Sequence, residues 1–577
     1  MQKNITRRTY SNDITLPDDI HPVLKRIYSS RNIRSEDEID YSLKRLLPFD
    51  QLMGITEAVK LLEHCLQDNK RILIVADFDA DGATSCALAK RGLELMGAVN
   101  VNYIVPNRFE FGYGLSPEIV EVAAQHRPDV IITVDNGISS IDGVSLARSK
   151  NIDVLITDHH LPGNHVPDAT VIVNPNQVGD QFPSKNLAGV GVIFYLLMAL
   201  RKHLREKGWF NQKNIDEPNL AELLDLVALG TVADVVPLDQ NNRILVSQGI
   251  ARIRAGKCCE GIKALFQVAK RPRHNVSSAD LGFVVAPRLN AAGRLTDMTL
   301  GIECLLSDDQ QSARQLARRL DQLNQERREI QAEMQLQALN EVVGIEPNTI
   351  DRMNAGFCLF NESWHQGVIG VLASKIKDKL HRPVIAFARD NNGFLKGSAR
   401  SIQGIHIRDV LETIAGKHPG LIDKFGGHAM AAGLTLRESD LSRFESVFDQ
   451  VTGQFMTDDS LERSMLTDGE LSGDDLNFSL AEILVNAGPW GQGFPEPRFD
   501  GEFCILDRKT VGSNHLKLNL KLVNHDQSFE AIAFNMTDKE WPASTERVKT
   551  VYKLDINEFA GRRKLQLVLD YIIPLQN

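Results

Sequence analysis

Three aspartates alternate along one short segment of the chain, Asp77-Phe78-Asp79-Ala80-Asp81-Gly82. An EF-hand calcium loop begins with the same spacing of aspartates. It also needs a helix before it and an acidic ligand at its twelfth position. Here no helix is predicted before the loop and the twelfth position is Leu88, so an EF-hand is excluded. An acidic turn without a ligand is the other alternative. Carboxylates this close repel one another and raise one another's pKa, and a divalent cation relieves that repulsion. The segment therefore predicts a metal site of a different kind.

Further acidic and imidazole side chains directly follow short apolar runs that we predict to be strands. They are Asp135, Asp158, His159 and His160. Ligands of open parallel sheets bind in the crevice beyond the carboxyl ends of the strands. A helix cap or a surface position would explain each residue alone, but several such strand ends together predict one shared site.

Asp234 is a lone carboxylate in the apolar run 230–236. A buried carboxylate is costly without a partner, so Asp234 is a cap, half of an ion pair or a metal ligand. Mixed aspartate and histidine ligands suit manganese or magnesium. Together, the candidate carboxylates carry more negative charge than one divalent ion would balance. They are Asp77, Asp79, Asp81, Asp135 and Asp234. The sequence therefore predicts two Mn²⁺ or Mg²⁺ ions, a pair that recurs in phosphoester cleavage.

The elements that position these residues alternate between apolar strands and helices. The predicted strands are 72–76, 101–105, 130–134 and 154–157, and the predicted helices between them are 83–95, 117–125 and 143–150. Strands that are apolar on both faces and joined by helices predict a doubly wound α/β domain with a parallel sheet.

A long helix, a second α/β domain and a small β module complete the predicted organisation. Neither Gly nor Pro occurs between Gly301 and Gly344, which predicts a helix of about 36 residues, with a capping box formed by Ser307 and Gln310. The acidic segment 457–475 predicts a linker, and the strict alternation of 516–522 predicts a small antiparallel β module. Its length fits a five-stranded barrel of the OB type or another small barrel. We expect five parts: a helical lead-in at 1–67, the first α/β domain at 68–300, the connecting helix at 301–345, the second α/β domain at 346–455, and the linker with the OB-type barrel at 456–577.

The composition excludes a disordered or membrane-embedded chain, because 43% of the 577 residues are hydrophobic and 24% are charged. We expect no signal peptide, because no apolar segment follows the N-terminal charges. The seven cysteines form no C-x-x-C pair, which favours a reducing compartment, the cytoplasm. The net charge of −10 argues only weakly against nucleic acid, because a metal site is itself built from carboxylates.

The aspartate and histidine motifs resemble those of the DHH phosphoesterase superfamily. Other segments resemble its RecJ family of bacterial exonucleases, which degrade single-stranded DNA from the 5′ end. These segments are Val105-Pro106-Asn107-Arg108-Phe109, Asn136-Gly137-Ile138-Ser139-Ser140, Pro287-Arg288-Leu289-Asn290-Ala291-Ala292-Gly293-Arg294 and Phe425-Gly426-Gly427-His428-Ala429-Met430-Ala431-Ala432-Gly433. The resemblance covers nearly the whole chain, and it implies a DHH domain, a DHHA1 domain at 346–455 and the OB-type barrel.

The resemblance also implies a role for each candidate residue. Asp79 and Asp135 would hold one ion, and Asp77 would complete its shell or stand just behind it. The other ion would be held by Asp81, Asp135, His159 and Asp234. Asp158 and His160 would orient ligands or assist proton transfer in catalysis.

A second group of residues predicts contacts to the nucleic-acid backbone. Lys396-Gly397-Ser398-Ala399-Arg400-Ser401 offers amides, hydroxyls and a guanidinium, which predicts a short turn that cradles a phosphate. The small residues after Gly426 either permit a close approach to a ligand or form a tightly packed helix. With the resemblance, the expected contacts to nucleic acid are Arg108, Arg288, Asn290, Arg294, Ser398, Arg400, Gly426, Gly427 and His428.

The resemblance implies a monomeric 5′→3′ exonuclease specific for single-stranded DNA. It also implies work in recombination and repair with a single-strand-binding protein and a RecQ-type helicase, and no membrane association. Two alternatives remain open: a DHH phosphoesterase acting on short oligonucleotides or cyclic dinucleotides, and a non-catalytic strand-binding protein.

Overall fold

The computed structural model describes residues 3–11, 13–107, 114–343, 354–390, 393–457, 463–512, 514–523, 525–537, 541, 545–559 and 562–575. The chain forms two compact units. The smaller unit contains Asp321–Ser464 with the short segments Met1–Asn4 and Ala291–Thr296, and the larger unit contains the rest.

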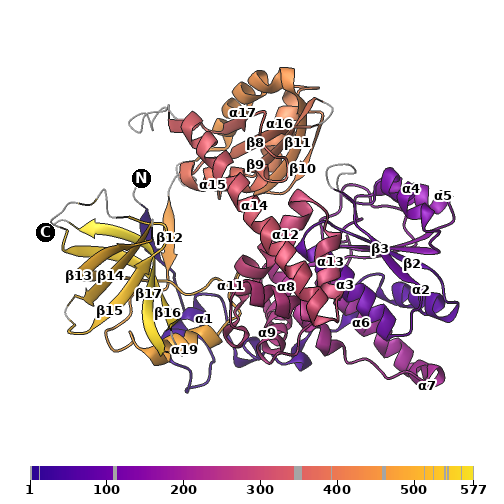
Figure 1. Cartoon of the computed structure of the whole chain (residues 1–577), viewed down its shortest axis with the longest axis horizontal. Coiled ribbons are helices and arrows are strands. Elements are labelled where there is room, and N and C mark those ends of the chain that lie inside the picture. The colour runs from indigo at the N-terminus through magenta and orange to yellow at the C-terminus, as the bar shows by residue number, and fades with distance from the viewer. Residues whose placement is uncertain are drawn as a thin grey trace. The chain divides into compact units, whose positions relative to one another are not determined.

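The larger unit contains a five-stranded parallel sheet with the order β3-β2-β4-β5-β6, and Figure 1 labels its strands β2 and β3. The strands are β2 (Ile72–Ala76), β3 (Val101–Ile104), β4 (Val130–Val134), β5 (Asp153–Thr157) and β6 (Val171–Val173). Every residue of β2 and β4 is buried, as expected for central strands covered on both faces. The predicted parallel sheet is therefore confirmed, and the sequence pattern missed only β6, an edge strand of three residues.

Helices cover both faces of this sheet. The helices α4 (Pro117–Gln125) and α5 (Ile141–Ser149) pack on one face, against alternate strand residues such as Leu73 and Ile131. The helices on the other face are α2 (Ile55–Gln67), α3 (Ala80–Leu95) and α6 (Gly189–Glu206). The result is the doubly wound arrangement, in which the carboxyl ends of β2, β4 and β5 share one edge.

A mostly helical region follows the sheet. Its helices are α7 (Trp209–Lys213), α8 (Leu224–Ala233), α9 (Gln240–Arg254), α10 (Glu260–Val268), α11 (Ser278–Asp280), the π-helical turn η6 (Leu281–Val285), α12 (Ala286–Leu295) and α13 (Thr299–Leu306). The helix α8 is buried along most of its length and packs against α3, α6 and α9. It therefore fixes the position of Asp234, which directly follows its last residue.

The predicted long helix is α14 (Gln310–Val343), with 34 residues. Its capping prediction is wrong. The carboxylate of Asp309 accepts a hydrogen bond from the Ser312 backbone N–H at 2.7 Å, so Asp309, rather than Ser307, caps the helix and sets its start at Gln310. The first residues of α14 belong to the larger unit and the residues from Asp321 to the smaller one.

The smaller unit contains a mixed sheet with the order β10-β11-β9-β8-β7. Its elements are β7 (Phe357–Phe360), α15 (Ile369–Leu380), β8 (Val384–Arg389), β9 (Phe394–Arg400), α16 (Ile407–Lys417), β10 (Lys424–Gly427), β11 (Ala431–Arg437) and α17 (Leu441–Phe455). Residues Ile385 and Phe387 face a core with α16 and α17, while Val384 and Ala386 face a core with α14 and α15. A second α/β domain is therefore present, as predicted.

The C-terminal strands close a barrel in the order β13-β14-β15-β17-β16. They are β13 (Phe499–Val511), β14 (His515–Leu522), β15 (Ser528–Ala533), β16 (Arg547–Phe559) and β17 (Arg562–Leu575), preceded by α19 (Phe478–Asn486). The alternating residues Leu516, Leu518 and Leu520 are buried in the barrel, which confirms the interpretation of that pattern. Among the described residues, no helix combines the length and apolar character needed to cross a bilayer.

The acidic segment 457–475 is only partly the linker that the sequence predicts. It contains β12 (Ser464–Thr467), which pairs with the N-terminal strand β1 (Asn4–Arg7). The carboxylate of Asp468 is buried and accepts hydrogen bonds from the Arg31 guanidinium, which follows α1 (Pro22–Ser29), at 2.7 and 3.1 Å. The acidic residues of this segment favour a solvent-exposed linker. Asp468 is nevertheless buried, because Arg31, which is distant in the sequence, neutralises its charge.

The buried ion pair between Arg31 and Asp468 makes a testable contribution to stability. Their side chains are only 1% and 2% exposed, so we expect Asp468→Ala to lower the free energy of unfolding by about 3–5 kcal/mol, because it leaves a buried charge uncompensated. The exposed pair between Arg45 and Asp37 is the matched control, and Asp37→Ala should cost less than about 1 kcal/mol. Urea unfolding of both variants measures the difference, and equal losses would contradict the burial argument.

Candidate metal centre

The aspartate loop joins β2 to α3. Asp77 follows the strand, and Asp79 caps the helix, because one oxygen of its carboxylate accepts hydrogen bonds from the backbone N–H groups of Asp81 at 2.9 Å and Gly82 at 3.0 Å. The cap places Asp81 in the first turn of α3, where it is buried. The alternation of aspartates thus follows from a strand end, a cap and a first helical turn.

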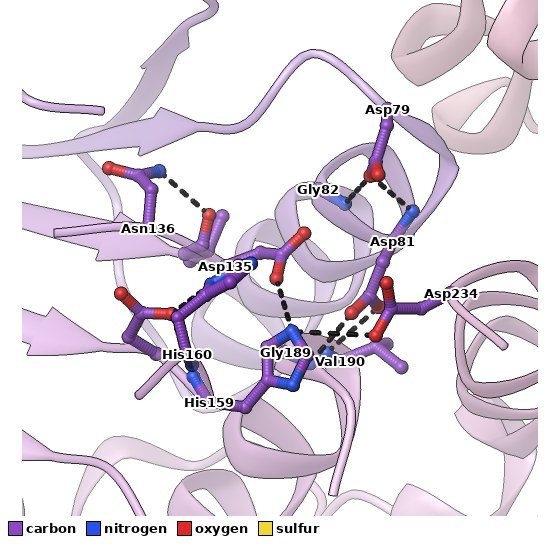
Figure 2. Close-up of polar contacts among 12 residues, drawn as sticks. Asp79, Asp81, Gly82, Asp135, Asn136, His159, His160, Gly189, Val190 and Asp234 are labelled. Atoms are coloured by element: carbon purple, nitrogen blue, oxygen red, sulfur yellow. Dashed lines mark hydrogen bonds and ion pairs between the residues drawn. The ribbon is translucent and has the colours of Figure 1, made fainter. Parts of the chain in front are cut away.

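The carboxylate of Asp81 points at the beginning of a second helix, α6 (Figure 2). It accepts hydrogen bonds from the backbone N–H groups of Gly189 at 2.7 Å and Val190 at 3.1 Å. A helix N-terminus carries partial positive charge and stabilises a carboxylate. A Cβ on Gly189 would lie 2.6 Å from the Cβ of Asp135. Only glycine at this position therefore lets the first turn of α6 lie so close to Asp135. Sequence reasoning missed Gly189, although Gly189-Val190-Gly191 before an apolar helix was a usable signal.

Asp135 directly follows β4 and has an uncommon backbone conformation. Its φ is +63°, which is costly for a residue other than glycine and clusters at functional sites. The side-chain amide of the next residue, Asn136, donates to the backbone carbonyls of Val75 at 3.0 Å and Val134 at 2.9 Å. This amide ties the ends of β2 and β4 together and holds Asp135 over the same edge as the aspartate loop.

His159 connects two of the predicted metal ligands. Its Nε2 lies 3.1 Å from an oxygen of Asp135 and 3.4 Å from an oxygen of Asp234 (Figure 2). Asp135 follows a strand, His159 follows β5, and Asp234 follows the helix α8. Three chain segments therefore converge on one imidazole nitrogen.

Asp158, which is buried, pairs with the half-buried His160 next to this group. The Nδ1 of His160 lies 2.7 Å from Asp158. The carboxylate of Asp158 also accepts hydrogen bonds from the backbone N–H groups of Ile138 at 2.9 Å, His159 at 2.7 Å and His160 at 3.1 Å. Asp158 thus fixes the backbone that carries both histidines, which fits the orienting role expected for it.

Three overlapping groups of side chains could each hold a cation. The groups are Asp77, Asp79 and Asp135; Asp81, His159 and Asp234; and Asp135, His159 and His160. In each group, one oxygen or nitrogen atom per residue lies within 4.8 Å of the others. The donors are carboxylate oxygens and imidazole nitrogens, which suit manganese or magnesium. Asp135 and His159 each belong to two groups. Because a carboxylate has two oxygens and an imidazole nitrogen binds only one ion, Asp135 is the better placed of the two to bridge two ions.

Three carboxylates of this centre, those of Asp81, Asp135 and Asp234, have a raised pKa. Burial raises the pKa of Asp135 well above its ordinary value, and the charge of Asp81 adds to the shift. The pKa of Asp234 is raised for the same two reasons. Burial and the charge of Asp79 raise the pKa of Asp81 to about 7, against the backbone hydrogen bonds that lower it. A divalent cation supplies the positive charge that this group of acids lacks.

In the neighbouring pair, Asp158 and His160, each side chain stabilises the charged form of the other. Burial alone would lower the pKa of His160, but its hydrogen bond to Asp158 and the surrounding carboxylates raise it to about 9. Burial alone would raise the pKa of Asp158, yet the hydrogen bond and charge of His160 outweigh it and lower the pKa. The pair is therefore an ion pair at neutral pH, and His160 can hold a proton beside the metal groups.

One of the predicted contacts to nucleic acid, Asn290, lies next to this centre. The side-chain oxygen of Asn290 accepts a hydrogen bond from the Ala80 backbone N–H at 2.8 Å, which places α12 against the aspartate loop. Arg288, on the same helix, donates to the carbonyl of Val284. Arg294 donates to the carbonyl of Gly367 at 3.3 Å. Arg108 lies outside the described residues.

The other predicted contacts lie together in the smaller unit, but not on a turn. Residues 396–400 belong to the strand β9, so the predicted turn is wrong: pairing with β8 and β11 holds this segment extended. The guanidinium of Arg400 donates to the Ser398 hydroxyl at 3.0 Å. A Cβ on Gly370, in the first turn of α15, would lie 2.9 Å from that guanidinium and 3.0 Å from that hydroxyl, so both side chains adjoin a helix N-terminus.

The glycine segment lies on the same sheet. Gly433 of β11 pairs with Gly426 on one side and with Ser398 on the other. Gly427 has a φ of +145° and ends β10, and His428 after it is exposed. The alternative of a tightly packed helix is therefore wrong, because these small residues form an antiparallel hairpin.

The shared carboxylate predicts how a metal changes stability. We expect Asp135→Asn to leave the metal-free protein at least as stable as the original, because a neutral amide replaces a buried acid whose charged form is disfavoured by burial and by its neighbours. The same change should weaken Mn²⁺ binding by more than about 100-fold, since losing even an indirect partner of a ligand costs about 10- to 100-fold. Thermal unfolding with and without Mn²⁺ measures both effects. Asp153→Asn, at the other end of β5, is the control and should keep the full Mn²⁺ response.

The raised pKa values predict a pH dependence of the same response. A carboxylate whose folded-state pKa is about 7 and whose unfolded pKa is about 4 binds its proton more tightly in the folded state. Its contribution to the stability of the metal-free protein is therefore complete below pH 4 and lost as the pH rises through 7. A cation must displace that proton, at a cost of about 1.4 kcal/mol per group at pH 6. We expect Mn²⁺ to raise the unfolding temperature more at pH 8 than at pH 6, and an equal rise would contradict the carboxylate site.

Comparison with known proteins agrees with this geometry. Three family models match the chain: the DHH family, N-terminal domain, at residues 71–231, the DHHA1 domain at 353–454 and the RecJ OB domain at 467–571. The single-stranded-DNA-specific exonucleases RecJ of Salmonella typhimurium and Escherichia coli are each 51% identical to it over the full length of both chains. The crystal structure of RecJ in complex with Mn²⁺ from Thermus thermophilus has a TM-score of 0.79 and 28% identity, over 97% of this chain and 77% of that one. The chain belongs to the RecJ family of the DHH phosphoesterases.

Proposed function

We propose that this chain is a metal-dependent exonuclease that hydrolyses phosphodiester bonds of single-stranded DNA from the 5′ end. The observation that supports it most directly is the sharing of Asp135 between two groups of potential ligands. The full-length similarity to exonucleases specific for single-stranded DNA supports the substrate. The OB-type barrel supports a polymeric strand, because this fold commonly binds oligonucleotides.

The donor sets fit two divalent cations of the kind found in the Mn²⁺ and Mg²⁺ complexes of the Thermus thermophilus relative. Asp77, Asp79 and Asp135 would hold one, while Asp81, His159 and Asp234 would hold the other. Asp135 would bridge the two, because one of its oxygens lies 3.1 Å from Nε2 of His159. When bound, such a pair lowers the pKa of water to give a nucleophile and stabilises charge on the departing oxygen.

The chain's own residues orient these ligands and manage protons. Asp158 holds the backbone of both histidines by accepting hydrogen bonds from their two N–H groups, and it also accepts one from the N–H of Ile138. The raised pKa of His160 keeps a proton on its imidazole at neutral pH, where it can be donated to a departing oxygen or can steady a phosphate. The N-terminus of α6 keeps Asp81 in place through two hydrogen bonds.

The smaller unit contributes a phosphate-binding surface in this proposal. Arg400 and Ser398 adjoin the first turn of α15, and a helix N-terminus with a guanidinium nearby favours an anion. Arg108, Arg288, Asn290, Arg294 and the segment Gly426, Gly427 and His428 would contact the strand as well.

The cellular setting is also part of the proposal. All seven cysteines are free thiols, which suits the cytoplasm. The family resemblance supports a monomer that acts in recombination and repair beside a single-strand-binding protein and a RecQ-type helicase.

Strands labelled at either end test the function. With Mn²⁺, we expect the full chain to release nucleotides from the 5′ end of a single strand, to leave a blunt duplex largely intact, and to stop when EDTA removes the metal. Asp135→Asn is the inactive control, and Asp153→Asn should retain activity. Loss of the 3′ label first, or activity after exhaustive chelation, would overturn the proposal. Hydrolysis confined to di- or trinucleotides or cyclic dinucleotides would favour a small-substrate phosphoesterase instead.

A further inference from the structure

The ring of Phe283 is 78% exposed, although Leu281 and Val285 on either side are buried. Phe283 lies in the π-helical turn η6, directly before α12. Such turns are rare and occur frequently at functional sites. A single exposed apolar residue is common on protein surfaces, so its surroundings decide what Phe283 does.

The segment that carries Phe283 touches the metal centre at two places. A Cβ on Gly282 would lie 3.2 Å from Val232 Cγ1, so η6 lies against the last turn of α8, two residues before Asp234. At the other end, Asn290 accepts the hydrogen bond of Ala80, between two aspartates of the metal loop. The segment 281–290 therefore borders the centre on two sides.

A second exposed apolar residue comes from the α8 side. Val235 directly follows Asp234, is 62% exposed and has a φ of +63°, a strained conformation for a β-branched residue. Its N–H donates to the Val232 carbonyl at 3.3 Å, and the Cβ position of Gly282 lies 4.0 Å from that same oxygen. The two segments that carry Val235 and Phe283 thus meet at one carbonyl, beside a candidate metal ligand.

The half-buried residues that follow Phe283 are the apolar Val284 and Pro287 and, on α12, the polar Arg288 and Asn290. Protein-docking patches are contiguous apolar areas of several hundred Å², which these polar neighbours interrupt. An exposed ring beside an amide and a guanidinium is instead the combination with which proteins bind single strands, stacking on bases and contacting the backbone.

We propose that Phe283 and Val235 form an apolar platform at the metal centre, and that one nucleobase of the bound strand stacks on the Phe283 ring. Stacking of this base would position the adjoining phosphodiester for hydrolysis. Because every base has a flat apolar face, the platform would favour unstacked strands without selecting a sequence. The inference rests on the proposed function, because it takes single-stranded DNA as the substrate.

Strands that lack one base test the platform. The substrates are a single strand of fixed sequence and a series in which one nucleotide at a time, counted from the 5′ end, is replaced by an abasic residue. The full-length proteins are the original chain, Phe283→Ala, Phe283→Leu and Phe283→Trp. Tyr10→Ala is the control, because Tyr10 is also an exposed aromatic residue, at 53%, on a different part of the larger unit. The measurements are kcat/KM with Mn²⁺ and the unfolding temperature with and without Mn²⁺.

We expect Phe283→Ala to lower kcat/KM on the intact strand by about 5- to 100-fold, Phe283→Leu to lose most of the same factor, and Phe283→Trp to retain activity. One abasic position should lower the activity of the original chain to a similar extent. On that strand alone, Phe283→Ala should lose less than about twofold more, because the ring and the missing base form one interaction. Tyr10→Ala should match the original chain throughout.

Two results would overturn the platform. Full activity of Phe283→Ala on the intact strand would mean that the exposed ring does not contact the substrate. An equal loss of activity by Phe283→Ala on the intact strand and on every abasic strand would mean that the ring has a structural role. If Phe283→Ala fails to fold by its unfolding temperature, the same comparison with Phe283→Leu decides. Inactivity of the original chain on all strands would instead overturn the proposed function, so the two failures are distinguishable.

Discussion

Mutual repulsion among buried carboxylates is the constraint on which this structure depends. Asp81, Asp135 and Asp234 come from three different chain segments, and burial together with their neighbours' charges raises the pKa of each. A folded chain tolerates such a group only where other interactions offset the repulsion. Here the offsets are the two backbone N–H groups at the start of α6, the imidazole of His159 and the cations that the groups could hold.

The doubly wound sheet makes this concentration of charge possible. Parallel strands place their carboxyl ends at one edge, so residues that follow β2, β4 and β5 meet without any long loop. The ends of two helices position the acids as well. The N-terminus of α6 donates a hydrogen bond to Asp81, and Asp234 directly follows the last residue of α8. Glycines at 189 and 230 let the helices approach closely, since a Cβ on Gly230 would lie 2.6 Å from an oxygen of Asp81.

In the proposed function, the remaining parts of the chain would bind the strand away from the metal centre. The mixed sheet of the smaller unit carries Ser398 and Arg400 at the beginning of a helix, and the closed barrel supplies a fold common among strand-binding proteins. A hydrolytic centre needs none of these to cleave a small phosphodiester. Their presence agrees with a strand that must be held at several points, the exposed Phe283 platform among them.

The sequence by itself determined the parallel sheet, the long helix and the barrel. Apolar runs indicate buried strands, a long segment without Gly or Pro indicates a helix, and strict alternation indicates strands with one buried face, because each pattern matches the geometry of its element. The sequence also identified the strand-end acids, since the ends of parallel strands share an edge whatever else the chain does. Only the tertiary structure decided which atoms meet. The pairing of Arg31 with Asp468, the approach of Gly189 to Asp81 and the extended form of residues 396–400 depend on segments far apart in the sequence. Local patterns do not record such contacts, because they are fixed by packing and charge between elements.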